Sequence, residues 1–156
     1  MHRFAVASFA VLLSACGAAP QECTVTNAFA LSPGEATGPL MRPGNNCLRC
    51  HAAGGEAARK PFSVGGTVFP SGDAGLCDGV EGVTIRVTDT NGKSVTLVSN
   101  AVGNFWSAEP LEPPLSISAE RDGRVLAMPV TTPTGGCALC HSWPDPVSAT
   151  GRIRAP

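Results

Sequence analysis

The sequence is poor in several residue types on which common classes of protein depend. It contains no tyrosine and only three histidines, and charged residues make up 15% of its 156 residues. It has no stripe of basic residues, so nucleic acid is not an expected partner. The chain instead has 18 glycines and 14 prolines. This composition predicts many turns and loops and little amphipathic helix.

The apolar run at the N-terminus is short as well. It covers residues 4–13, is interrupted by Ser8, and is too short to span a bilayer as a helix. A short polar segment with Arg3 precedes it, and the small residues Ser14 and Ala15 at its end fit a cleavage site. We therefore predict that residues 1–15 are a signal peptide. The remaining residues, about 140 of them, are expected to form one exported domain.

The residue after the predicted cleavage site is Cys16. Leu-Ser-Ala-Cys resembles the lipobox of bacterial lipoproteins, and the resemblance implies that Cys16 is acylated and tethers the chain to a membrane. Gly17 stands where an Asp commonly retains lipoproteins at the inner membrane, so the outer membrane of the cell envelope is favoured. The alternative is an ordinary secretory signal with a cysteine near the cut.

Two five-residue segments carry the main chemical signal. They are CLRCH at Cys47–His51 and CALCH at Cys137–His141, and Cys-x-x-Cys-His is the attachment signature of c-type haem. In such a site the two thiols add across the vinyl groups of the porphyrin, and the histidine ligates the iron. The predicted haem-binding residues are Cys47, Cys50 and His51 in the first motif, and Cys137, Cys140 and His141 in the second.

The histidine count strengthens this interpretation. His2 is lost with the signal peptide, so each histidine of the mature chain follows a Cys-x-x-Cys pair. The chain thus resembles a dihaem c-type cytochrome lipoprotein. This resemblance implies two haems c and a membrane-tethered electron carrier that exchanges electrons with redox partner proteins.

Two other uses of the four motif cysteines remain open. Distant Cys-x-x-Cys pairs also gather four thiolates around one zinc or iron ion. Alternatively, the pairs form disulfides in a non-catalytic β-domain that serves as a binding module. Visible absorbance distinguishes these cases, because haem is red whereas zinc thiolates and disulfides are colourless.

The other cysteines and the methionines allow two further predictions. Of the seven cysteines, Cys23 and Cys77 have no other assignment, and in an oxidising compartment they are expected to form a disulfide. Both histidines are used as the first axial ligands, so none remains as a sixth ligand. Met41 and Met128 each precede a motif and are the candidate sixth ligands, which would raise the haem potential.

The stretch between the motifs predicts β-structure. Short alternating segments are separated by turn signals such as Asn91-Gly92, and about six strands are expected. The fold class is therefore mainly β, a small antiparallel sandwich over residues 62–130. Loop-rich CxxCH segments at 41–61 and 131–156 flank it, and residues 16–40 form a flexible tether. The predicted strands are Val64–Phe69, Val83–Thr88, Val95–Val98, Phe105-Trp106, Ile117–Glu120 and Val125–Met128.

Two details of this sandwich concern the motifs. Gly65-Gly66, inside the first predicted strand, indicates a β-bulge. An even number of alternating strands returns the chain to the end where it entered. Both motifs are therefore expected at the same pole of the sandwich, even though 85 residues separate them.

The β-stretch also resembles the carboxypeptidase regulatory-like domains of the transthyretin-like (prealbumin-like) fold. Segments that carry the resemblance are Gly66-Thr67-Val68, Gly82–Val87, the Asp89–Gly92 turn and Ser99–Phe105. It implies a non-catalytic accessory domain.

No enzyme active site is predicted. No histidine is available for a Ser/His/Asp set, no glycine-rich phosphate loop is present, and no small-molecule substrate is evident. A peroxidase working at an open haem position stays a lesser alternative, since no distal acid–base residue is recognisable.

Overall fold

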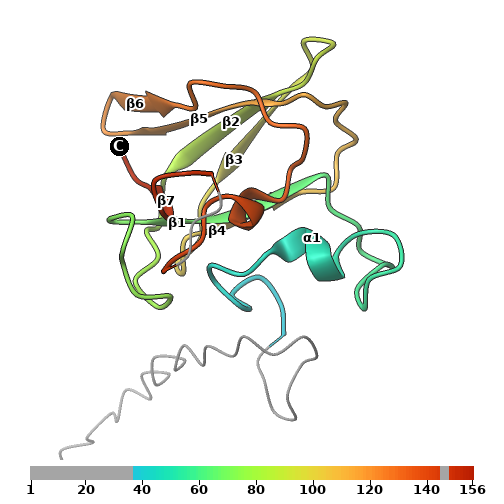
Figure 1. Cartoon of the computed structure of the whole chain (residues 1–156), viewed down its shortest axis with the longest axis horizontal. Coiled ribbons are helices and arrows are strands. Elements are labelled where there is room, and N and C mark those ends of the chain that lie inside the picture. The colour runs from blue at the N-terminus through green and yellow to red at the C-terminus, as the bar shows by residue number, and fades with distance from the viewer. Residues whose placement is uncertain (1–36, 145–147) are drawn as a thin grey trace, which may run out of the picture.

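The computed structural model of the protein describes residues 37–144 and 148–156 (Figure 1). The predicted signal peptide, Cys16, Cys23 and most of the predicted tether lie outside these residues. The elements in chain order are α1 (Cys47–Cys50), β1 (Val64–Phe69), β2 (Thr84–Thr88), β3 (Ser94–Val98), β4 (Asn104–Ser107), β5 (Ser116–Arg121), β6 (Arg124–Ala127), the 3₁₀ turn η1 (Cys137–Leu139) and β7 (Ile153–Arg154).

The strands form two sheets that pack face to face. One has the order β4-β1-β7 and the other β3-β2-β5-β6. All pairs are antiparallel except β1 with β7. Figure 1 shows the four-stranded sheet on one side of β1 and α1 on the other. The predicted mainly β sandwich with loop-rich flanks is confirmed, and each of the six predicted strands is present.

The predicted hairpin turns explain the pairing of β2 with β3 and of β5 with β6. Gly92 has a φ of +81°, and Asp122 and Gly123 have φ values of 51° and 75°. Positive φ at these positions is what tight hairpin turns require. In the first turn the Asp89 side chain accepts hydrogen bonds from the backbone N–H groups of Asn91 and Lys93.

Buried and exposed side chains alternate along β2 and Val83 just before it, and the buried ones form part of the core. Val83, Ile85 and Val87 are buried, whereas Arg86 between them is exposed. They form one apolar cluster with Val64, Val68, Phe105 and Leu115. This is the half-buried pattern that a sheet with one solvated face produces.

Strand β1 differs, because all six of its residues are buried. Its pairing with β4 runs without interruption from Val64↔Ser107 to Thr67↔Asn104, so the predicted bulge at Gly65-Gly66 is wrong. The outer face of β1 is covered by residues 39–51, and the Gly44 N–H donates to Thr67 Oγ1 at 2.7 Å. Strand β1 is therefore the middle of three layers.

Within residues 37–144 and 148–156, no helix has both the length and the apolar character needed to cross a membrane.

Cys77, in the loop between β1 and β2, forms a disulfide. The other cysteines in the described part of the chain, Cys47, Cys50, Cys137 and Cys140, are free. The partner of Cys77 thus lies outside the described residues, and the Cys23–Cys77 pairing remains a prediction.

A double-mutant cycle tests that pairing. Cys77→Ser should lower the free energy of unfolding by about 2–4 kcal/mol, because the unfolded chain loses a crosslink. Cys23→Ser should cost the same, and the double variant should cost no more than either single one. The measurement is equilibrium denaturation with urea. Additive losses would show that the two cysteines do not pair with each other.

Candidate functional site

The first CxxCH motif forms a single helical turn. The N–H of His51 donates to the Cys47 carbonyl at 2.9 Å, which closes the one-turn helix α1. Residues three and four positions apart lie on the same side of such a turn. Cys50 and His51 are therefore brought to the side of the turn on which Cys47 lies.

The second motif repeats this turn. The N–H of His141 donates to the Cys137 carbonyl at 3.0 Å, although the residues between are a 3₁₀ turn. In both motifs the first thiol lies near the backbone carbonyl of the residue two positions before it. Cys47 Sγ lies 3.8 Å from the Asn45 carbonyl oxygen, and Cys137 Sγ lies 3.6 Å from that of Gly135. The chain thus contains the same local structure twice.

Both histidine rings are held in the same way. His51 Nδ1 lies 2.8 Å from the Lys60 carbonyl oxygen, and His141 Nδ1 lies 3.0 Å from the Gly151 carbonyl oxygen. A carbonyl oxygen can only accept, so Nδ1 carries the proton in each ring. Nε2 then holds the lone pair and is the atom able to bind a metal.

An aromatic row supports the first histidine. The Phe62 ring stacks on His51 with a centroid distance of 3.9 Å and an interplanar angle of 7°. Trp106 of β4 follows at 6.0 Å from Phe62. Stacking and the hydrogen bond together fix the plane of the His51 ring.

The two motifs meet at neighbouring residues of β1. A Cβ on Gly65 would lie 2.9 Å from Cys47 Cβ, and a Cβ on Gly66 would lie 2.9 Å from Cys137 Cβ. Successive strand residues point to opposite faces, so the first cysteines approach β1 from its two sides. The N–H of Gly65 also donates to the Gly135 carbonyl. The prediction that the motifs lie close together is confirmed, because their first cysteines pack against adjacent residues of one strand.

Burial raises the pKa of the first thiol of each motif. Desolvation raises the pKa of Cys47 from 9.0 to about 11. The pKa of Cys137 rises to about 12, first through desolvation and then through the nearby charge of Cys47.

Two buried side-chain amide atoms beside the first motif have no hydrogen-bond partner in the described part of the chain. They are Asn45 Nδ2 and Asn46 Oδ1. Asn46 Oδ1 lies 3.0 Å from where a Cβ on Gly136 would be, so it is close to both motifs. A buried polar atom without a partner is costly, so these two atoms are places where ordered water or a bound group can supply a hydrogen bond.

For the two predicted methionine ligands the structure gives backbone hydrogen bonds. The Met41 carbonyl accepts a hydrogen bond from Asn104 Nδ2 at 2.8 Å, which fixes the loop before α1. Met128 follows β6, and its N–H donates to the Ile117 carbonyl. Among the described contacts, none joins either sulfur to His51 or His141. Ligation by Met41 and Met128 remains a prediction.

Several residues of the site were not identified from the sequence. These are Phe62, Asn46 and the residues whose carbonyls hold the histidines, Lys60 and Gly151. Phe62 offers a signal, since an aromatic residue soon after a CxxCH motif can reach its histidine. A backbone carbonyl offers none, because every residue has one.

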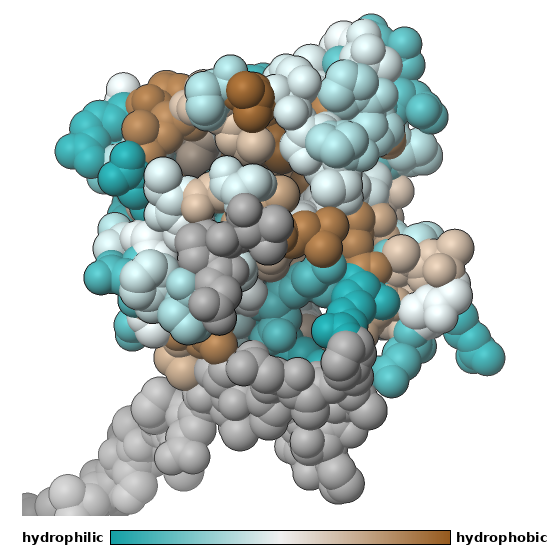
Figure 2. Space-filling view, in the orientation of Figure 1, coloured by the Kyte–Doolittle hydropathy of each residue, from teal (hydrophilic) through white to brown (hydrophobic). Residues whose placement is uncertain are grey.

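The surface around the second motif is partly apolar. Leu139 and Trp143, on either side of His141, are 46% and 47% exposed. Figure 2 shows that apolar residues reach the surface in several separate places on this face. The motif therefore lies beside apolar surface that a further group could cover.

Comparison of the chain with protein families, curated proteins and solved structures finds no match. The geometry of the site thus carries the functional argument.

The contacts of the glycine pair can be tested by substitution. An alanine in place of a strand glycine ordinarily stabilises through the unfolded chain. Gly65→Ala and Gly66→Ala should instead each cost about 1–3 kcal/mol, because the new methyl group overpacks against a cysteine. Equilibrium unfolding measures both.

A second substitution supplies the control. Cys47→Gly removes the Cβ that Gly65→Ala would meet. It should therefore restore part of the loss in Gly65→Ala and none of the loss in Gly66→Ala. If Cys47→Gly rescued Gly65→Ala and Gly66→Ala equally, the two glycines would not contact different cysteines.

Thiol reactivity tests the burial of the first cysteines in the chain without cofactor. At neutral pH, a pKa raised from 9.0 to about 11 or 12 lowers the thiolate fraction roughly 100-fold or 1,000-fold. Cys47 and Cys137 should react with iodoacetamide more slowly than in urea, by less than these factors because a thiolate of higher pKa is also more nucleophilic. Their rates should rise with pH up to the folded pKa. Mass spectrometry of each peptide measures this, and equal folded and unfolded rates would disprove it.

Proposed function

We propose that the protein is an exported electron carrier with two covalently bound c-type haems, one at each CxxCH motif. The carrying observation is that both motifs form the same turn and hold their histidines in the same tautomer, by the hydrogen bonds to Lys60 and Gly151. Bound haem would supply a one-electron redox centre at each motif.

The roles of the chain's own residues follow from the two turns. Four free thiols would form the thioether bonds, and they are Cys47, Cys50, Cys137 and Cys140. His51 and His141 would present Nε2 to the iron. The Lys60 and Gly151 carbonyls orient the rings and raise their basicity, as outer partners of metal-bound histidines do.

Three further features fit a bulky group at the motifs. Gly65 and Gly66 leave β1 without side chains where the motifs pack, so both turns can lie against the sheet. The unpaired atoms Asn45 Nδ2 and Asn46 Oδ1 are polar atoms that a cofactor or its ordered water could satisfy. Leu139 and Trp143 offer apolar surface next to His141.

The arrangement of the thiols supports haem over one shared metal ion. Among the residues that the structure describes, no group of three or more His, Cys, Asp or Glu is placed to hold a metal ion. Cys47 and Cys137 lie on different sides of β1. A four-thiolate site needs all four sulfurs about 2.3 Å from one ion.

The neighbouring positions of the motifs also bear on electron transfer. Anchoring at adjacent residues of β1 would keep the two redox centres near each other. Electrons could then pass between them before leaving to a redox partner protein. Met41 and Met128 remain the proposed sixth ligands, because the mature chain has no third histidine.

The location of the carrier rests on the N-terminal sequence. Acylation of Cys16 would tether the domain to the membrane, with the outer membrane favoured. Export also brings the chain to the compartment in which disulfides persist, in agreement with the disulfide of Cys77.

Paired substitutions test the haem assignment. The protein is produced by export in a host that attaches haem c, and intact mass and visible absorbance are measured. The wild type should carry two haem increments. Cys47→Ser/Cys50→Ser and Cys137→Ser/Cys140→Ser should each remove one, because each motif lacks its thioether anchors. Cys77→Ser is the control and should keep both haems.

Each other result has a distinct meaning. A colourless wild-type protein would refute the proposal. Bound zinc or iron by elemental analysis would then favour the four-thiolate site, and a mass lower by two hydrogens per Cys-x-x-Cys pair would favour disulfides.

A further inference from the structure

The carbonyl that orients the second histidine lies next to a buried arginine. His141 Nδ1 lies 3.0 Å from the carbonyl oxygen of Gly151, which belongs to the segment between the second motif and β7. Gly151 has a φ of +95°, a conformation that glycine adopts without strain. The next residue, Arg152, is only 8% exposed, and arginine is rarely buried to this extent.

Three contacts fix Arg152 to the loop between β1 and β2. Its backbone N–H donates to the Gly72 carbonyl at 2.9 Å, and its Nε donates to the Ala74 carbonyl at 2.8 Å. Its guanidinium carbon lies 4.8 Å from the centre of the Phe69 ring, within the range of a cation–π contact. Both the backbone and the side chain of Arg152 are therefore held.

The same loop packs directly against the backbone around Gly151. A Cβ on Gly151 would lie 2.5 Å from the Gly72 carbonyl oxygen, and a Cβ on Gly72 would lie 2.9 Å from the Thr150 carbonyl oxygen. The loop also contains Cys77, which forms a disulfide. The Gly151 carbonyl thus belongs to a segment that a crosslinked loop holds in place.

The guanidinium group also reaches the segment of the first motif. A Cβ on Gly44, three residues before Cys47, would lie 2.9 Å from Arg152 Nη1 and 3.2 Å from Phe69 Cζ. Arg152 therefore lies where the segments of both motifs meet the loop that follows β1.

We propose that Arg152 is a positioning residue for His141. By holding its own segment against the loop, it keeps the Gly151 carbonyl at Nδ1, so that Nδ1 retains the proton and Nε2 stays available to a metal. His51 is supported in another way, since the Phe62 ring stacks on it. That His141 ligates iron rests on the proposed function, whereas the hold on its ring does not.

The tautomer of each histidine is measured by ¹⁵N NMR in the full-length protein and in Arg152→Met. Methionine has a similar length but no N–H group in its side chain. In the wild type, His51 and His141 should both carry the proton on Nδ1. In the variant His141 should partly change to the Nε2–H form, which free histidine prefers, because its acceptor is no longer fixed. His51 should stay unchanged and is the internal control.

In a chain that carries haem, iron at Nε2 would itself fix the tautomer, so proton exchange is measured instead. The reduced, carbon monoxide-bound protein is used, because it is diamagnetic. The Nδ1 proton of His141 should exchange with water about tenfold faster in Arg152→Met than in the wild type, since local opening exposes it. Exchange of the Nδ1 proton of His51 should not change.

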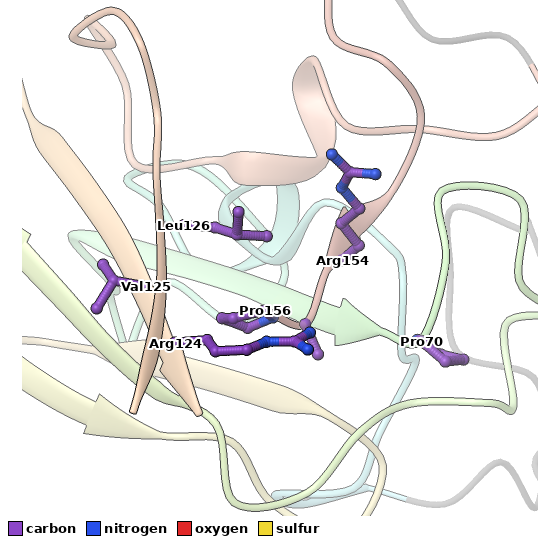
Figure 3. A pocket seen from close by; sticks show the side chains of 7 residues that line it. Pro70, Arg124, Val125, Leu126, Arg154 and Pro156 are labelled. Atoms are coloured by element: carbon purple, nitrogen blue, oxygen red, sulfur yellow. The ribbon is translucent and has the colours of Figure 1, made fainter. Parts of the chain in front are cut away.

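Two further variants locate the effect. Gly72→Ala acts from the side of the loop, where its methyl group would push away the segment before β7, and it should affect His141 as Arg152→Met does. Arg154→Met is the matched control. Arg154 lies two residues beyond Arg152, on the same face of the chain, but it is exposed, and Figure 3 shows its side chain pointing away from Arg124. Its loss should change neither histidine.

The proposal is overturned if His141 behaves in Arg152→Met as it does in the wild type. It is equally overturned if His51 changes as much as His141, which would indicate a loss of global stability, or if Arg154→Met has the same effect. Thermal unfolding checks that each variant is folded, and Gly72→Ala carries the test if Arg152→Met does not fold. Haem content is not the readout, so this test and that of the electron carrier can fail independently.

Discussion

The close packing of two cysteines against two adjacent glycines is the constraint on which the structure depends. Cys47 approaches Gly65 from the outer face of β1, and Cys137 approaches Gly66 on the face that Phe105 shares. Neither approach leaves room for a Cβ on the strand. Because strand residues alternate between faces, one glycine could not serve both motifs.

This constraint makes the motif segments part of the fold. The segment before α1 is fixed to the outer face of the β1 sheet by Thr67 and Asn104, whose side chains bond to the Gly44 N–H and the Met41 carbonyl. Cys137 packs against the apolar core. A small sandwich buries little apolar surface by itself, and these two segments add a third layer and close one edge.

The same arrangement positions the thiols and histidines of both motifs. Each turn places two thiols and a histidine on one side, and a carbonyl from a later loop sets the tautomer of the ring. These carbonyls belong to residues 9 and 10 positions beyond His51 and His141. The loops that follow the motifs therefore act as supports for the imidazoles, although they share no sequence pattern.

The sequence by itself determined what depends on local pattern: six strands, two hairpins with Gly92 and Gly123, and two CxxCH turns. Alternation and turn residues act within a few positions, so they can be found in one dimension. Only the tertiary structure decided the long-range features. The role of Gly65-Gly66, mistaken for a bulge, depends on cysteines far away in the chain. Strand β7 is two residues long and exists because β1 pairs with it. The carbonyls of Lys60 and Gly151 reach the two histidines only because separate segments meet in space, and local sequence carries no signal for such contacts.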